Sequence, residues 1–395
     1  MHHHGFLFAP ERTAMTSQLL EPAPAPAIHP GLEGVVFAET RLSHVDGLAG
    51  RLLLAGHRIE ELAPRATFEE AAFLLQVGRL PAAAELEALR LELEARRTLP
   101  ATTLALLEAA AQGGVPAMDA LRLAVDSLAL ILPKEKKSDS PFAPAGLAVL
   151  ARLPLLIAAS ERLARGERPL EPKPGLSTAA QLLYLLDGRE PSPERVRALD
   201  TYLVTVCDHS SNASTFTLRV IVSTRSDLLS ALVGAIGALK GPLHGGAPGP
   251  ALDTVFEIGS PERAEPVLRE KLARGERLMG FGHRVYKVYD PRARVLASAA
   301  EALFAADADR ELYALARHVE TVALRLLEEQ KPGRRLHTNV EFYTALLLHG
   351  LGLPTHLFTP VFALGRTAGW LAHAREQEAE GKLIRPSLRY VGPSC

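Results

Sequence analysis

The 395 residues predict a mainly α-helical protein of two domains with a short β-hairpin near the N-terminus. Chains of this length exceed what one hydrophobic core usually supports, so two domains are expected. Apolar residues recur three and four positions apart along most of the chain, which is the period of one helix face. The sequence shows no regular alternation of strands and helices, so its glycine-rich segments are not expected to be nucleotide loops on a parallel sheet.

Composition excludes several classes of partner. Lys plus Arg (44) nearly balance Asp plus Glu (45), and the net charge of -1 gives no electrostatic reason to expect nucleic acid or an anionic membrane surface. Two cysteines, Cys207 and Cys395, cannot build a disulfide framework and suit a reducing compartment. The first residues, MHHHGFLFAPERTAM, do not resemble a signal peptide. We therefore expect a cytoplasmic protein.

The N-terminal part divides into a loose segment, a hairpin and helices. Residues 1–30 are expected to be poorly structured, because EPAPAPAIHPG is rich in Pro and Ala. Residues 34–54 are β-branched and apolar around the turn pair Asp46 and Gly47, which predicts a hairpin. Thr67 is the expected cap of a helix that ends at Gly78, and Pro81 opens the next helix.

Helices continue to the C-terminus. Asp227 is the expected cap of LLSALVGAIGALK, and further helices are predicted at 193–207, 262–274, 292–305, 310–329 and 360–379. Residues 342–365 carry no Asp, Glu, Lys or Arg, but Gly350, Gly352 and Pro354 interrupt them. This pattern indicates two buried helices joined by a turn rather than a membrane span.

Histidines, arginines and one glutamate gather among turn-forming residues in four segments. His209, His244, His283 and Glu341 lie one in each. Individually each has an ordinary structural interpretation, such as a turn histidine or a first-turn acid. Together they allow a metal site, although no pair has the i, i+4 spacing of HExxH. They also allow acid–base chemistry, in which a carboxylate removes a proton, imidazoles donate to developing oxyanions and arginines hold carboxylates. The second interpretation uses every residue type present, so we favour it and expect no metal.

Five blocks, four of which overlap these segments and one of which follows them, carry a family resemblance. They are HSSNASTF (209–216), GALKGPLHGGA (237–247), GFGHRVYKVYDPR (280–292), NVEFYTA (339–345) and FALGRTAGWLAH (362–373). In order and spacing they resemble citrate synthases, and the likeness extends over residues 31–392. It implies a mainly helical homodimer, with a large domain (31–245 and 353–395) and a small mobile domain (246–352). It also implies the condensation of acetyl-CoA with oxaloacetate to give citrate and CoA, with no cofactor beyond these substrates.

The resemblance assigns expected roles to matching residues. His244 matches the family's histidine that hydrogen-bonds the thioester oxygen, and His283 matches the histidine that protonates the oxaloacetate carbonyl. Glu341 matches the family's carboxylate base. The remaining matches are His209, Arg292 and Arg366 for oxaloacetate, Arg385 for oxaloacetate in the partner subunit's site, and Lys287 for a CoA phosphate.

Three departures from the family pattern bear on activity. The usual NVDFY is NVEFY at Glu341, GGAN is GGAP at Pro248, and RPR is RPS at Ser387. Together they resemble a group of secondary citrate synthases in bacteria. The longer carboxylate implies either a slower enzyme or a reshaped pocket. Two alternatives remain open: a 2-methylcitrate synthase that uses propionyl-CoA, and a catalytically weak homologue that binds ligands as a regulator.

Overall fold

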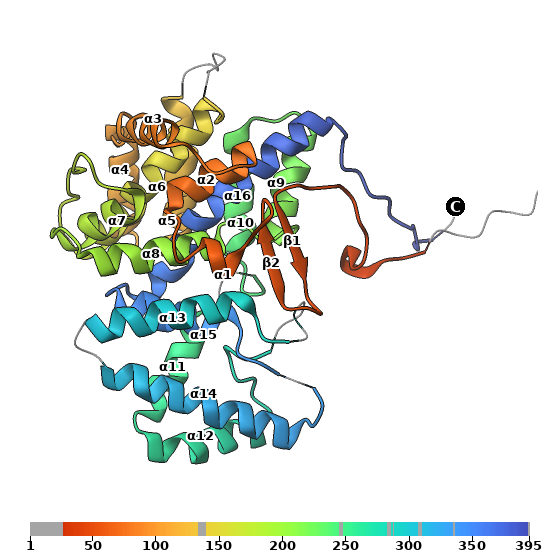
Figure 1. The fold of residues 1–395 in the computed structure, drawn as a ribbon. Helices are drawn as coiled ribbons and strands as arrows, with labels where there is room; N and C mark the ends of the chain where they lie inside the picture. The colour runs from red at the N-terminus through yellow and green to blue at the C-terminus, as the bar shows by residue number, and fades with distance from the viewer. Residues whose placement is uncertain are drawn as a thin grey trace, which may run out of the picture. The chain divides into compact units, whose positions relative to one another are not determined.

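The computed structural model describes residues 27–132, 140–244, 248–282, 286, 288–306, 310–334 and 336–393. The chain divides into two units, Met1–Glu39 and Thr40–Cys395. The first contains a short 3₁₀ turn, η1 (Pro30–Leu32), and the second contains the helices and strands that follow (Figure 1). The prediction of a mainly α-helical fold with an N-terminal hairpin is confirmed.

The hairpin forms at the predicted turn. Strands β1 (Ser43–Asp46), β2 (Arg51–Leu54) and β3 (His57–Arg58) pair antiparallel in chain order, with Ser43 opposite Leu54. The Asp46 carboxylate accepts the backbone N–H groups of Leu48 and Ala49 at 3.1 and 2.9 Å, which stabilises the turn. Strand pairing begins at Ser43, later than the apolar stretch from residue 34 suggested.

Within residues 27–132 and 140–244, the structure has ten α-helices. They are α1 (Ile59–Leu62), α2 (Phe68–Val77), α3 (Ala83–Glu94), α4 (Ala101–Gln112), α5 (Ala117–Ser127), α6 (Pro144–Ala164), α7 (Thr178–Asp187), α8 (Pro193–Val206), α9 (Ala213–Ser223) and α10 (Leu228–Leu239), with a 3₁₀ turn η2 at Leu128–Leu130. Thr67 caps α2 in a reciprocal pair with Glu70, and Gly78 ends that helix with φ +86°. Asp227 caps α10 through the Ser230 N–H. These predicted boundaries are confirmed.

The described residues after 247 contain six further α-helices. They are α11 (Pro248–Ile258), α12 (Pro261–Ala273), α13 (Pro291–Ala306), α14 (Arg310–Gln330), α15 (Val340–Gly350) and α16 (Phe358–Glu380), with a 3₁₀ turn η3 at Thr355–Leu357. In Figure 1, α12 and α14 lie side by side, and α13 packs against α15. Helix α13 also packs against α8, so it joins the segment predicted as a small domain to the rest. The predicted boundaries at 245/246 and 352/353 stay a prediction.

Residues 342–365 form the end of α15, η3 and the start of α16, as expected of two buried helices with a turn. Across the described ranges, every helix is too short or too polar to cross a membrane.

Two glycines let α16 approach the end of α8 closely. A Cβ on Gly369 would lie 2.3 Å from the Cys207 carbonyl oxygen and 2.6 Å from the Asp208 carboxylate. The Gly369 N–H donates to that carbonyl at 3.1 Å. A Cβ on Gly365 would lie 2.8 Å from Val206. This contact brings one face of α16, which carries Arg366, Trp370 and His373, to the segment that contains His209.

Candidate active site

Glu341 occupies the first turn of α15, and several hydrogen bonds fix where that helix begins. The Asn339 side chain caps the helix by accepting the Glu341 N–H at 3.0 Å. Its amide nitrogen donates to the Gly282 carbonyl at 2.8 Å, and its backbone N–H donates to Gly280 at 2.9 Å. Gly280 has φ +89°, and a Cβ there would lie 2.9 Å from Phe342. The glycine turn and the start of α15 are therefore hydrogen-bonded and closely packed against each other.

Asp290 ties Arg292 to the same helix start. Its buried carboxylate accepts hydrogen bonds from the Nε and Nη2 of Arg292 at 3.1 and 2.9 Å. It also accepts one from the Val340 N–H at 3.3 Å. The Arg292 guanidinium lies over the Tyr286 ring, 5.7 Å from its centre. One carboxylate thus positions both a buried arginine and the backbone of α15.

The Glu341 carboxyl is poised for proton transfer. Burial raises its pKa to about 7, with Asp290 adding to the rise, while the positive charges of Arg292 and Arg366 oppose it. Its backbone N–H is capped, but within the described ranges its carboxylate accepts no hydrogen bond. A carboxylate without fixed partners and with a pKa near neutrality is suited to act as a general base.

Arg366 is a buried cation that could bind an anionic ligand. Its Nε donates to the Val206 carbonyl at 2.7 Å, and its guanidinium lies 4.8 Å from the centre of the Phe362 ring. Burial, helped by the like charge of Arg292, lowers its pKa to about 10 despite the opposing charge of Asp208. No carboxylate in the described part of the chain pairs with it directly. Two neighbouring guanidiniums in a low-dielectric site favour a ligand that carries two negative charges.

His244 is held as a neutral imidazole with a defined tautomer. The Ser214 backbone N–H, in the first turn of α9, donates to His244 Nε2 at 3.3 Å. A backbone N–H can only donate, so Nε2 carries no proton and the ring N–H is on Nδ1. Burial lowers the pKa of His244 to about 4, and Arg366 adds to this effect. The imidazole therefore presents one N–H donor throughout the neutral pH range.

The Ser214 hydroxyl completes the support of His244. It lies 2.9 Å from His244 Nε2 and 2.8 Å from the Asn212 amide oxygen, either of which can accept its single proton, and it accepts the Trp370 indole N–H at 3.3 Å. Trp370 is fully buried, as expected of a core residue, but it also anchors this hydroxyl. Ser214 and Trp370 are supporting residues that the sequence did not single out as such.

Asp208 holds the segment that carries His209. Its buried carboxylate accepts the Ser43 hydroxyl at 2.5 Å and contacts His373 Nε2 at 3.1 Å. Burial opposes its ionisation, but His373, Arg366 and Ser43 outweigh burial and lower its pKa. The neighbouring His209 ring lies with its Nε2 3.1 Å from the Tyr286 hydroxyl.

The predicted site residues have different outcomes. Arg366 acts electrostatically on both His244 and Glu341, and Arg292 acts on Glu341, so these four lie in one electrostatic environment. His209 is linked to Arg292 through Tyr286, which contacts both. His283 and Lys287 lie outside the described residues.

Arg385 lies on an exposed, non-helical segment after α16. That segment is attached to the body by the Ile384 N–H, which donates to the Ser223 hydroxyl at 3.1 Å, and by the Lys382 carbonyl, which accepts the Gln377 amide at 3.0 Å. In the described part of the chain, no three His, Cys, Asp or Glu side chains group as metal ligands.

Comparison with known proteins identifies similar chains. Residues 31–387 match the family model described as citrate synthase, C-terminal domain. The chain is 40% identical over 363 residues to a citrate synthase from Synechocystis sp., covering 92% of this chain and 90% of that protein. It is 38% identical over 366 residues to a citrate/2-methylcitrate synthase from Bacillus subtilis, covering 92% and 96%.

A solved structure shares the fold as well. It is the citrate synthase of the thermophilic archaeon Thermoplasma acidophilum in a ternary complex with carboxymethyl coenzyme A and oxaloacetate. The similarity has a TM-score of 0.84 at 31% identity and covers 94% of this chain and 97% of that one.

Proposed function

We propose that this chain, which belongs to the citrate synthase family and is therefore an acyltransferase, condenses acetyl-CoA with oxaloacetate and hydrolyses citryl-CoA to citrate and CoA. The observation that carries the proposal is that Arg366 acts electrostatically on both Glu341, whose carboxylate accepts no hydrogen bond from the described residues, and the neutral imidazole of His244. A base and a hydrogen-bond donor of this kind are what proton abstraction next to a thioester carbonyl requires.

The first step uses both groups. Glu341 takes a proton from the acetyl methyl group, and the electrons of that C–H bond move toward the thioester oxygen. The Nδ1–H of His244 donates a hydrogen bond to this oxygen as it gains charge. Because Ser214 fixes Nε2 as the acceptor, the donor is oriented before the reaction and need not reorganise.

The second step joins the two substrates. Oxaloacetate carries two carboxylates, which Arg292, Arg366 and His209 would hold. The enol carbon attacks the ketone carbon, and His283 would donate a proton to the ketone oxygen as the C–C bond forms. Water then cleaves the thioester of citryl-CoA and releases CoA, whose phosphate Lys287 would meet. The roles of His283 and Lys287 rest on the family resemblance alone.

We also propose a homodimer in which Arg385 reaches the partner's oxaloacetate site. Large apolar side chains flank Arg385 on its exposed segment, and Leu388, Tyr390 and Val391 are 99%, 77% and 88% exposed in the single chain. This segment is hydrogen-bonded to the body of the protein at Lys382 and Ile384, and apolar side chains exposed to this degree favour contact with another protein surface. A second copy would cover them and would gain Arg385.

The test is CoA release from acetyl-CoA or propionyl-CoA in the presence of oxaloacetate, with an enzyme-only blank for thiol reagents. Cys207 is buried and burial raises the pKa of its thiol, so it should contribute little to the blank. Faster release from acetyl-CoA is expected. Preference for propionyl-CoA would favour the 2-methylcitrate alternative, for which the Bacillus subtilis relative is named. Stabilisation by oxaloacetate without CoA release would indicate a ligand-binding regulator instead.

A further inference from the structure

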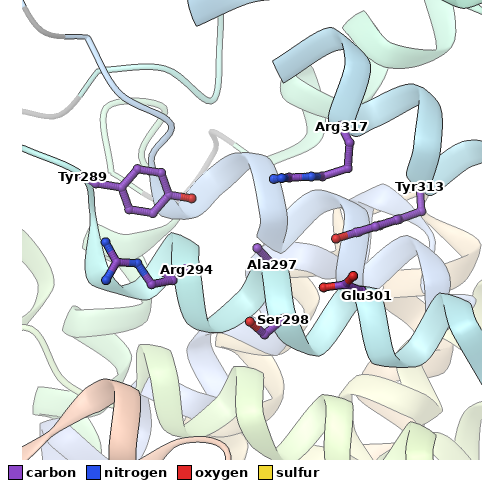
Figure 2. Close-up of a pocket in the computed structure, with 7 residues that line it drawn as sticks. All are labelled: Tyr289, Arg294, Ala297, Ser298, Glu301, Tyr313 and Arg317. Carbon is purple, nitrogen blue, oxygen red and sulfur yellow. The ribbon is translucent and has the colours of Figure 1, made fainter. Parts of the chain in front are cut away.

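A trough of about 340 Å³ lies between α13 and α14, and its lining includes none of the residues assigned above to the condensation (Figure 2). Its polar lining is Tyr289, Arg294, Ser298, Glu301, Tyr313 and Arg317. Arg294, Ala297, Ser298 and Glu301 follow the i, i+3, i+4, i+7 pattern of one face of α13. Cavities of this size commonly hold small molecules.

The trough offers hydrogen-bond donors from two arginines, of which Arg294 has no acidic partner and Arg317 has one in the described ranges. The Arg294 guanidinium lies 5.4 Å from the centre of the Tyr289 ring and forms no ion pair with any residue in the described ranges. Among the described residues, Arg317 donates through its Nη1 alone, to Glu320 at 2.6 Å and to the Tyr343 hydroxyl at 2.5 Å. Burial raises the pKa of Tyr289 to about 12, so its hydroxyl stays a donor.

The arrangement of these groups along the trough indicates the shape of the ligand. Figure 2 shows Tyr289 and Arg294 at one end, Glu301 and Tyr313 at the other, and the Arg317 guanidinium directed toward the space between. Arg294 and Glu301 are seven residues apart on one helix, or about 10 Å along its axis. Two guanidiniums and a phenol supply more donors than a single carboxylate group can use, whereas a phosphate dianion accepts them with three oxygens.

We propose that this trough is a second binding site, for a small phosphate-bearing molecule that places its phosphate between Arg294 and Arg317 and a hydrogen-bond donor near Glu301. The site also connects to the condensation site. Glu320, which Arg317 pairs with, is buried and accepts the Thr338 and Tyr343 hydroxyls at 2.6 and 2.5 Å.

Thr338 directly precedes Asn339, which caps the helix that carries Glu341. A phosphate that draws Arg317 away leaves Glu320 as a buried charge with fewer partners, and the start of α15 loosens. An effect on turnover by this route rests on the function proposed above, whereas binding does not.

The binding test is calorimetric titration of the full chain with inorganic phosphate at low ionic strength. Arg294→Gln removes an exposed guanidinium that forms no ion pair with the described residues, so the fold should be retained. A charged hydrogen bond of typical strength corresponds to about a tenfold weaker affinity in the variant. Arg263→Gln, an exposed arginine on α12, should bind phosphate as the wild type does. Equal binding by Arg294→Gln, no binding by the wild type, or equal affinity for succinate would overturn the proposal.

The connection to α15 is tested by amide hydrogen exchange over residues 336–345, which needs no turnover. Phosphate should speed exchange there by about threefold or more in the wild type, because local opening becomes easier. It should leave exchange in Arg294→Gln unchanged. Phosphate binding that depends on Arg294 without any change in exchange would refute the connection, and inactivity with both substrates would count against the proposed function alone.

Discussion

Shortening Glu341 by one methylene tests whether its surroundings are built for glutamate. The start of α15 is held by Asn339, by the Asp290 bond to the Val340 N–H, and by the Gly280 contact with Phe342. The backbone therefore cannot move to compensate when Glu341→Asp withdraws the carboxylate by up to about 1.5 Å. A displacement of about 1 Å costs on the order of 100-fold in rate, which corresponds to about 2.7 kcal/mol in the barrier.

The assay is steady-state CoA release from acetyl-CoA at saturating oxaloacetate. We expect kcat to fall by about 100-fold in Glu341→Asp. The affinity for oxaloacetate, measured by its effect on thermal unfolding, should stay within about twofold, because Arg292 and Arg366 are untouched. A variant that matches or exceeds the wild type would refute the reasoning, since it would show that the site fits the shorter aspartate equally well.

Three further predictions concern the base, the dimer and the helix contact. Because burial raises the pKa of Glu341 to about 7 and only the ionised form can act as a base, kcat/KM should fall as the pH is lowered through that value; a flat profile between about pH 6 and 8 would contradict this. Arg385→Ala and Glu341→Gln should each be nearly inactive, yet a 1:1 mixture of the two should recover about a quarter of wild-type activity, since half of the dimers would have one complete site; no recovery would count against a shared site. Gly369→Ala should destabilise the fold by about 1–3 kcal/mol in thermal unfolding, because its Cβ would meet the Cys207 carbonyl. Gly249→Ala, which meets nothing within 4 Å, is the matched control, and equal stability of the two variants would argue against the close contact.

Local signals made parts of the fold predictable. Thr67 and Glu70 form a capping box, and Gly78 adopts the left-handed conformation that ends α2. The Asp46 carboxylate accepts a hydrogen bond from the backbone of the turn that follows it. Each of these depends on residues within a few positions of one another. In contrast, α9 begins at Ala213 inside a segment that was singled out for its chemistry, and its Asn212 cap was not predicted. Helices α4, α5, α6, α7 and α11 likewise lie in segments for which no boundary was predicted.

The reactive side chains of the site were easier to predict than their supports. Histidine and glutamate stand out among turn formers, so His209, His244 and Glu341 could be proposed from sequence, whereas Arg292 and Arg366 were assigned by the family resemblance. Their supports act across the fold, and no local pattern marks such pairs.

Two examples illustrate such long-range support. His373 contacts Asp208 although 165 positions separate them, and Trp370 bonds Ser214 across 156 positions. The tautomer of His244 follows from the Ser214 N–H, 30 positions away, and could only be read from the geometry.

The most direct test of the account replaces Glu341 by Gln, which keeps the size of the side chain and removes the base. Turnover with acetyl-CoA and oxaloacetate should fall by about 100-fold or more, since general base catalysis contributes factors of this order. Thermal stabilisation by oxaloacetate should remain close to that of the wild type. Turnover within about threefold of the wild type would show that another group removes the proton, and loss of both turnover and oxaloacetate binding would show that Glu341 is structural.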